Sequence, residues 1–169
     1  DAFQDAREDG PEPRTVHLGV DLFAPAGTEV RAPLDGVVVS AVSNPAPLDY
    51  GPTLILEHEG DAGRPFSTLY GHLDGEVLER LTAGDRVSAG EVVARLGDES
   101  ENGGWPPHLH FQVVLDRLGR VGDFPGVAAP TWRRAWTGLC PDPAPHQGLG
   151  KCGAREPRTA GHRGARRAR

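Results

Sequence analysis

The sequence contains no methionine, a single lysine and only 6% aromatic residues among its 169 positions. Because Asp1 stands where a start methionine would stand, we expect a leader or an upstream domain to be missing. The only lysine, Lys151, falls in a polar C-terminal stretch, which argues against a biotin or lipoyl carrier, because such modules hold their cofactor on a lysine at an exposed hairpin tip. No stretch approaches the roughly 20 consecutive apolar residues of a membrane span, so we expect none.

Glycine and proline are abundant, with 23 and 16 residues, while the hydrophobic fraction is only 37%. This composition argues against helix bundles and coiled coils. Charge is divided along the chain: residues 1–150 carry 11 basic and 23 acidic residues, whereas residues 151–169 carry seven and one. The acidic main part argues against nucleic acid as a partner.

Three zones follow from the apolar pattern. Residues 1–14 are polar and broken by proline, which indicates a linker or frayed end, and residues 15–140 form the domain. Residues 141–169 are rich in Pro, Gly and Arg, and we expect this tail to be disordered because it cannot bury enough apolar surface. Cys140 and Cys152 flank the start of the tail, and the sequence leaves open one disulfide or two free thiols.

Short runs rich in Val, Leu and Ile, separated by turn residues, predict an all-β fold: a compact antiparallel β-sandwich or barrel-sandwich hybrid with short helical turns. The expected strands are Glu29–Ala32, Gly36–Val42, Thr53–His58, Phe66–Tyr70, Arg86–Val87, Glu91–Leu96 and His108–Leu115. Helical turns are expected over Asp74–Leu81, capped by Asp74, and over Thr131–Leu139, where Trp132 and Trp136 would dock the helix on the sandwich.

Two segments resemble each other, Ala26–Ser40 and Ala83–Gly97. Each consists of a turn, a short strand, a second turn with glycine and a β-branched strand. This weak internal repeat predicts hairpins folded over one another.

Two histidines, His108 and His110, lie in the predicted strand PPHLHFQVVL. Alternate side chains of a strand share a face, so both imidazoles project from one face together with Gln112, while Leu109 and Phe111 point into the core. Two histidines spaced in this way indicate either a solvated face or a metal or catalytic site.

The segment HLGVD places His17 four residues before Asp21. In a fully extended strand the two side chains would stand roughly 13 Å apart, at ~3.3 Å per residue, and one cation could not bind both. A bend at Gly19, which tolerates conformations closed to other residues, would bring them together.

A further histidine, His72, follows a probable strand at the turn of YGHL. Lone histidines at turns are usually surface residues, and we interpret His58, His146 and His162 in that way. His72 gains interest only beside the other two elements.

Together the three elements predict a zinc site. A catalytic zinc ion takes three His or carboxylate ligands and keeps a fourth position for water, whose pKa falls to about 7. His17, Asp21 and His110 supply such a set for one ion per chain. His108 would accept the proton of the water, and His72 would hold the developing oxyanion or steady His108.

The motifs HLGVD, YGHL and HLHF, in that order, together with APAGTEVRAPLDGVV and GDRVSAGEVVARLG, resemble the lysostaphin-type zinc metallopeptidases, which cut peptide cross-links of bacterial peptidoglycan. The resemblance covers roughly residues 15–116. It implies zinc ligands at His17, Asp21 and His110, His108 as general base, His72 as second catalytic imidazole, and peptidoglycan or a Gly-rich peptide as substrate.

The chain departs from the family pattern at two places. Trp105, Pro106 and Pro107 form a bulky loop before the HxH strand, and Gln112 stands where many members have Glu. These stretches, with SNPAPLDYGPT, GDFPGVAAP and LCPDP, resemble a version found inside bacterial fusion proteins, between a kinase-like phosphotransferase region and a pyridoxal-phosphate aminotransferase region. That likeness implies missing fused partner domains and a cytoplasmic location, whereas a lost leader would imply the cell envelope.

Two functions are therefore open. The first is a zinc-dependent metalloendopeptidase acting on peptidoglycan-like peptides. The second is a metal-binding but non-hydrolytic scaffold or regulator within a larger polypeptide, which would apply if the loop before the HxH strand blocked the groove.

Overall fold

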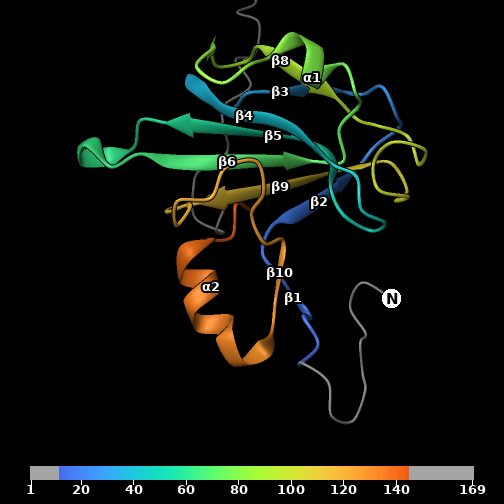
Figure 1. The fold of residues 1–169 in the computed structure, drawn as a ribbon. Helices are drawn as coiled ribbons and strands as arrows, with labels where there is room; N and C mark the ends of the chain where they lie inside the picture. The colour runs from blue at the N-terminus through green and yellow to red at the C-terminus, as the bar shows by residue number, and fades with distance from the viewer. Residues whose placement is uncertain (1–11, 145–169) are drawn as a thin grey trace, which may run out of the picture.

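The computed structural model describes residues 12–144, which form one large antiparallel sheet with smaller elements on both of its faces (Figure 1). The strands of the large sheet are β2 (Val20–Phe23), β4 (Gly36–Asn44), β5 (Gly51–His58), β6 (Phe66–Gly71), β7 (Arg86–Val87) and β9 (His108–Val114). Their order is β2-β9-β6-β5-β4-β7. The predicted antiparallel β fold with short helices is confirmed.

Two further antiparallel pairs flank the large sheet. They join β1 (Val16–His17) to β10 (Val127–Ala128) and β3 (Glu29–Arg31) to β8 (Val92–Arg95). The helical elements are η1 (Asp61–Gly63), α1 (Val77–Arg80), η2 (Pro130–Trp132) and α2 (Arg133–Leu139).

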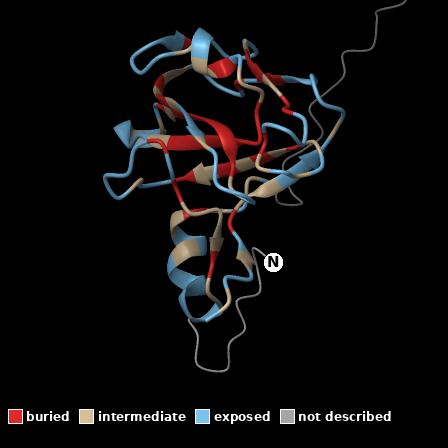
Figure 2. Cartoon of the chain, turned by 45° about the vertical axis from the view of Figure 1, so that its right-hand side comes forward, coloured by how far each residue is buried: buried red, intermediate tan, exposed pale blue. Residues whose placement is uncertain are grey.

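Hydrophobic side chains are buried on both faces of the large sheet, and its central strands are the most buried part of the molecule (Figure 2). Along β5, Leu54 and Leu56 belong to a cluster beneath α1, β3 and β8, while Ile55 faces a second cluster. Phe124 and Cys140 join that second cluster from the C-terminal segment. Successive side chains of β5 point to opposite faces of the sheet and so belong to two different hydrophobic cores.

The internal repeat corresponds to reciprocal strand pairing. The first copy contains β3 and β4 and the second contains β7 and β8; β3 pairs with β8, and β4 pairs with β7. Each strand of one repeat unit therefore pairs with a strand of the other, which agrees with the predicted folding of one hairpin over the other.

All seven predicted strands are present, with ends displaced by at most two residues. Three strands were not predicted, namely β1, β2 and β10. Two of them contain only two residues each, and β2 is an edge strand with three exposed positions, so none carries a periodic apolar signal.

Both predicted helices are present but differ in detail. The first begins at Val77, and Asp74 does not cap it: Glu76 is the N-cap and makes no side-chain capping bond. The turn over Gly75 and Glu76 already satisfies the first amides of the helix, because Leu78 N–H donates to Gly75 and Glu79 N–H to Glu76. The prediction of an Asp74 cap was wrong.

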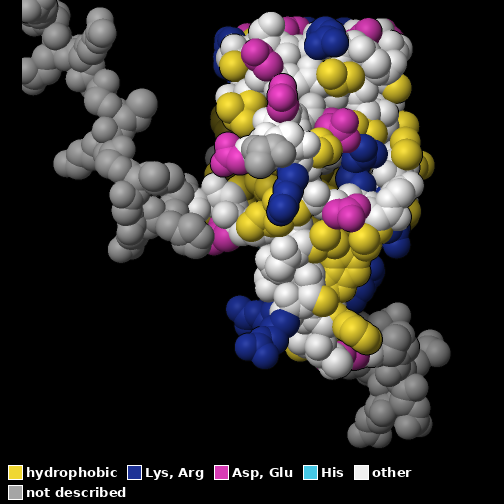
Figure 3. Space-filling model, turned by 90° about the vertical axis from the view of Figure 1, so that its left-hand side faces the viewer, with side chains coloured by type: hydrophobic (Ala, Val, Ile, Leu, Met, Phe, Trp, Pro, Cys, Tyr) yellow, Lys and Arg dark blue, Asp and Glu magenta, His cyan; other side chains and the backbone are white. Residues whose placement is uncertain are grey.

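The two tryptophans of the second helical segment behave differently. Trp136 packs edge-on against Phe124 with ring centroids 5.9 Å apart, as expected, but Trp132 is 63% exposed. Docking was therefore predicted correctly for Trp136 alone. Hydrophobic side chains gather on the surface where the α2 region joins the sheet (Figure 3).

Within residues 12–144 no helix is long and apolar enough to cross a membrane. The expectations for residues 1–11 and 145–169, including Cys152, His146 and His162, fall outside the described residues. Cys140 is a buried free thiol.

Candidate metal centre

A break between β1 and β2 brings His17 and Asp21 together. His17 ends β1, and β2 begins at Val20, so the chain changes direction at Leu18 and Gly19. His17 Nε2 lies 3.3 Å from Asp21 Oδ1. The predicted bend at Gly19 is confirmed, but its reason is space: a Cβ there would lie 2.6 Å from the carbonyl oxygen of Phe111.

The third polar group comes from β9, which pairs with β2 so that Asp21 is opposite His110. His110 Nδ1 lies 3.2 Å from Asp21 Oδ1 and 3.0 Å from His17 Nε2. His108, His110 and Gln112 share one face of β9, as predicted, and all three are buried. Strand pairing thus joins HLGVD to HLHF.

The three atoms form a donor set suited to zinc. Their separations, 3.0, 3.2 and 3.3 Å, are close to the roughly 3.3 Å expected between ligands 2.0–2.1 Å from a tetrahedral zinc ion. Two imidazole nitrogens and one carboxylate oxygen are also the ligand types of catalytic zinc sites. The residues present therefore fit the metal.

Charge in the cluster is centred on Asp21. Partial burial alone would raise the pKa of Asp21, but hydrogen bonds from His110 and His17, and attraction to both rings in their protonated form, hold it well below its usual value. The hydrogen bond to Asp21 in turn raises the pKa of His17. Asp21 is therefore ionised and available as an anionic ligand.

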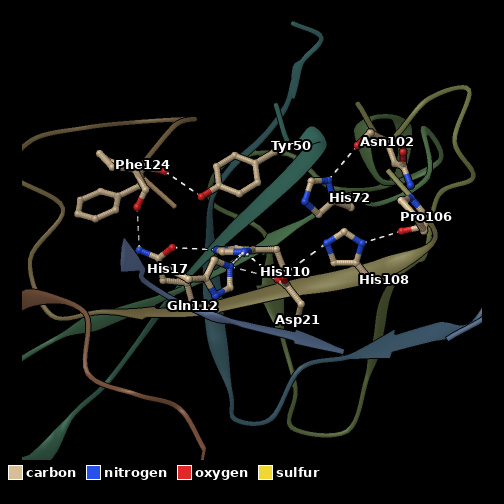
Figure 4. A network of polar contacts seen from close by, with 11 residues as sticks. His17, Asp21, Tyr50, His72, Asn102, Pro106, His108, His110, Gln112 and Phe124 are labelled. Atoms are coloured by element: carbon tan, nitrogen blue, oxygen red, sulfur yellow. Dashed lines mark hydrogen bonds and ion pairs between the residues drawn. The ribbon is translucent and has the colours of Figure 1, made fainter. Parts of the chain in front are cut away.

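Two further imidazoles lie beside this cluster (Figure 4). His108 Nδ1 donates to the carbonyl of Pro106 at 2.7 Å, and His72 Nδ1 donates to the carbonyl of Asn102 at 2.8 Å. A carbonyl only accepts, so the proton of each neutral ring sits on Nδ1 and Nε2 is left as an acceptor. His108 Nε2 lies 3.8 Å from Asp21 Oδ1.

His72 was interpreted as a turn residue, and the structure adds that it is buried, with a positive φ of 62°. Burial lowers its pKa to about 4. Its ring lies 4.4 Å from that of His108, centroid to centroid. The three motifs of the sequence therefore converge in one place.

The cluster opens into a cavity of about 770 Å³. Trp105 and Pro106 line this cavity rather than fill it, so the bulky loop forms a wall of the groove. Phe23, which is 70% exposed, also lines the cavity and stacks on His108 with ring centroids 4.9 Å apart.

Sequence reasoning missed some residues of this region and misread a histidine elsewhere in the sheet. Phe23 and Tyr50 carry no motif or periodic signal, although Tyr50 is buried beside His110 and donates a hydrogen bond to Phe124. His58 was interpreted as a surface residue, which was wrong: it is 1% exposed and bonds Asp35 and Thr68. It lies in β5, a strand buried on both faces.

A groove in which two imidazoles and a carboxylate meet at one point, with two more imidazoles beside them, has the residues that a metal-dependent hydrolase requires. The sequence matches the profile of peptidase family M23 over residues 15–120, so the chain belongs to this family of zinc metallopeptidases. Its class is therefore that of the metalloendopeptidases, and the lysostaphin-type resemblance is confirmed.

The chain is also similar to named proteins and to a solved structure. The chain is 32% identical over 116 residues to the "DD-carboxypeptidase/endopeptidase Mpg" of Neisseria meningitidis, covering 69% of this chain and 24% of that protein. It is 30% identical over 103 residues to the "Peptidoglycan DD-endopeptidase ShyC" of Vibrio cholerae, covering 61% and 21%. The lysostaphin catalytic domain from Staphylococcus simulans is 28% identical, with 72% and 84% covered and a TM-score of 0.47.

The chain thus spans a quarter or less of the length of these two relatives. The likeness to the middle domain of fusion proteins stays a prediction.

Proposed function

We propose that this domain is a zinc-dependent endopeptidase that hydrolyses peptide cross-links of peptidoglycan. The observation that carries the proposal is the convergence of His17 Nε2, Asp21 Oδ1 and His110 Nδ1 within 3.3 Å of one another in a groove. The names of the Neisseria and Vibrio relatives support D,D-peptide bonds of peptidoglycan as the substrate class.

In this proposal His17, Asp21 and His110 hold one zinc ion per chain. When bound, zinc is a Lewis acid that polarises a carbonyl oxygen and lowers the pKa of a coordinated water to about 7. Asp21 contributes one negative charge, and the two histidines bind as neutral rings. His17 and Asp21 are about one-third exposed, so the cluster is accessible from the groove.

His108 is assigned as the general base. Its Nδ1–H is committed to the carbonyl of Pro106, so Nε2 is the atom that accepts the proton of the attacking water. Phe23 stacks on the His108 ring, a contact that favours this orientation of the ring. Only the neutral imidazole can perform this step.

His72 is assigned as a second acceptor beside His108. Its Nδ1–H is donated to Asn102, and its pKa of about 4 keeps the ring neutral at pH 7. A neutral ring in this tautomer cannot donate from Nε2 to an oxyanion, so of the two roles given for His72, holding the oxyanion and steadying His108, we favour the second.

A groove blocked by the loop before the HxH strand would favour the alternative of a non-hydrolytic scaffold. Trp105 and Pro106 line an accessible cavity beside the cluster, which supports the enzyme instead.

The test is release of new amino groups from purified peptidoglycan and from oligoglycine by the zinc-loaded chain. We expect release from a cross-linked substrate, and loss of that release in His108→Ala with zinc content unchanged. Control variant His58→Gln, altered in a buried histidine outside the groove, should retain activity. Equal signals from the wild type and His108→Ala, with zinc bound, would support the scaffold.

A further inference from the structure

The side-chain amide of Gln112 links the cluster to the C-terminal segment. Gln112 Oε1 lies 3.0 Å from His110 Nε2, the ring nitrogen that faces away from His17 and Asp21. Gln112 Nε2 lies 3.1 Å from the carbonyl oxygen of Pro125 and 3.2 Å from Cys140 Sγ. Gln112 is 0% exposed and Cys140 is 3% exposed, so water does not compete for these bonds.

These contacts fix which way the amide points. The carbonyl of Pro125 only accepts hydrogen bonds, so the NH₂ group of Gln112 must face it. Oε1 then faces His110 Nε2 and can only accept, which places the proton of a neutral His110 ring on Nε2. The lone pair is left on Nδ1, the atom that faces His17 and Asp21.

The partners of Gln112 are held by the fold. Cys140 N–H donates to the carbonyl of Trp136 at the end of α2, and Leu115 N–H, just after β9, donates to Leu139 at 2.9 Å. Trp136 packs against Phe124, the neighbour of Pro125. Pro125 and Cys140 both lie beyond residue 120, where the family match ends.

We infer that Gln112, held by Pro125 and Cys140 of the segment 124–140, is a positioning residue that sets the tautomer of His110 and so the affinity of the centre for zinc. The inference rests on the proposed function, because it takes His110 as a ligand. Residues that bond the outer nitrogen of a metal-bound histidine typically change metal affinity 10- to 100-fold when removed.

The test measures zinc affinity of the full chain by competition with a chromophoric chelator, without any substrate. Gln112→Leu, which keeps the volume and removes the acceptor, should bind zinc about 10- to 100-fold more weakly. Gln112→Glu restores an acceptor for His110 Nε2–H, so its zinc affinity should stay close to that of the wild type even if its thermal midpoint falls.

Asn44→Leu is the matched control. Asn44 Nδ2 donates to the carbonyl of Gly122 at 3.1 Å and to Thr53. It therefore holds the loop that leads to Pro125 against the sheet, but it makes no bond to His110 or Gln112. We expect a lower thermal midpoint with unchanged zinc affinity. A loss equal to that of Gln112→Leu would mean that any loosening of the loop suffices, and would overturn the inference.

A second readout needs no variant. Long-range ¹H–¹⁵N correlation spectra of the neutral, zinc-free wild type should report His110 as the Nε2–H tautomer, and an Nδ1–H tautomer would overturn the inference. If the wild type binds no zinc, the proposed function fails. If the wild type binds zinc and Gln112→Leu binds it equally well, only the role of Gln112 fails.

Discussion

His17 Nε2 and His110 Nδ1 lie 3.0 Å apart although 93 residues separate them in the sequence. They meet because β2 pairs with β9, which sets Asp21 opposite His110, and because the chain bends between β1 and β2. The approach of two nitrogens and a carboxylate is what a shared cation would stabilise.

His17→Ala and His110→Ala should each lose the bound zinc, because either change leaves two ligands. Elemental analysis after dialysis should give one zinc per wild-type chain and a small fraction of that for each variant. His58→Gln is the control, since His58 bonds Asp35 and Thr68 away from the cluster. Equal zinc in all four proteins would contradict the ligand assignment.

Gly19→Ala should destabilise the protein and weaken zinc binding. The added Cβ would meet the carbonyl oxygen of Phe111 at 2.6 Å and His110 Nε2 at 2.9 Å, so β2 must move away from β9. Overpacking of this kind typically costs about 1–3 kcal/mol. Urea unfolding of the zinc-free protein and chelator competition measure the two effects.

Gly138→Ala provides the contrast to this substitution. A Cβ at Gly138, within α2, meets nothing within 4 Å, and alanine favours the helix by roughly 0.5–1 kcal/mol. We expect a slightly more stable protein with unchanged zinc affinity. If Gly19→Ala were equally stable and bound zinc equally well, the close approach of Gly19 to Phe111 and His110 would not be needed for the site.

The stability of the zinc-free protein should fall as pH decreases from about 6.5 to about 4. The pKa of His72 is about 4 in the folded state, against an ordinary 6.5, so the unfolded chain binds its proton first. The neutral form contributes about 3 kcal/mol, which is complete above pH 6.5 and is lost on acidification.

The comparison is with His72→Asn, because asparagine tolerates the φ of 62° at this position. His17, whose pKa is raised, acts in the opposite sense and contributes stability that is lost as pH rises, so the difference between the two proteins isolates His72. Denaturant unfolding at pH 7.5 and pH 5 should show a smaller loss of unfolding free energy for His72→Asn than for the wild type. An equal loss in the two proteins would refute the buried neutral state of His72.

Phe23→Ala should lower turnover without removing the metal. The Phe23 ring stacks on His108, and such aromatic contacts contribute about 0.5–1.5 kcal/mol, which corresponds to roughly a 2- to 12-fold lower kcat. Leu34→Ala removes another exposed side chain and should leave kcat unchanged. A change in KM alone would mean that Phe23 binds substrate and does not hold the base.

Sequence reasoning succeeded where the signal is local. Alternation and turn residues located seven strands, and the i, i+2 spacing of His108 and His110 placed both rings on one face of β9. It failed where neighbours in space decide. His58 looks like any exposed histidine in sequence, and only its contacts with Asp35, Thr68 and Phe66 in the folded chain bury it.

The sequence by itself determined the fold class and the five polar residues of the groove, because strand periodicity and residue chemistry act over a few neighbouring positions. Tertiary structure alone decided which nitrogen of each imidazole faces the groove. That choice depends on the carbonyls of Pro106 and Asn102 and on the amide of Gln112, itself held by residues 124–140. A hydrogen bond needs two atoms within about 3 Å, and folding brings them there.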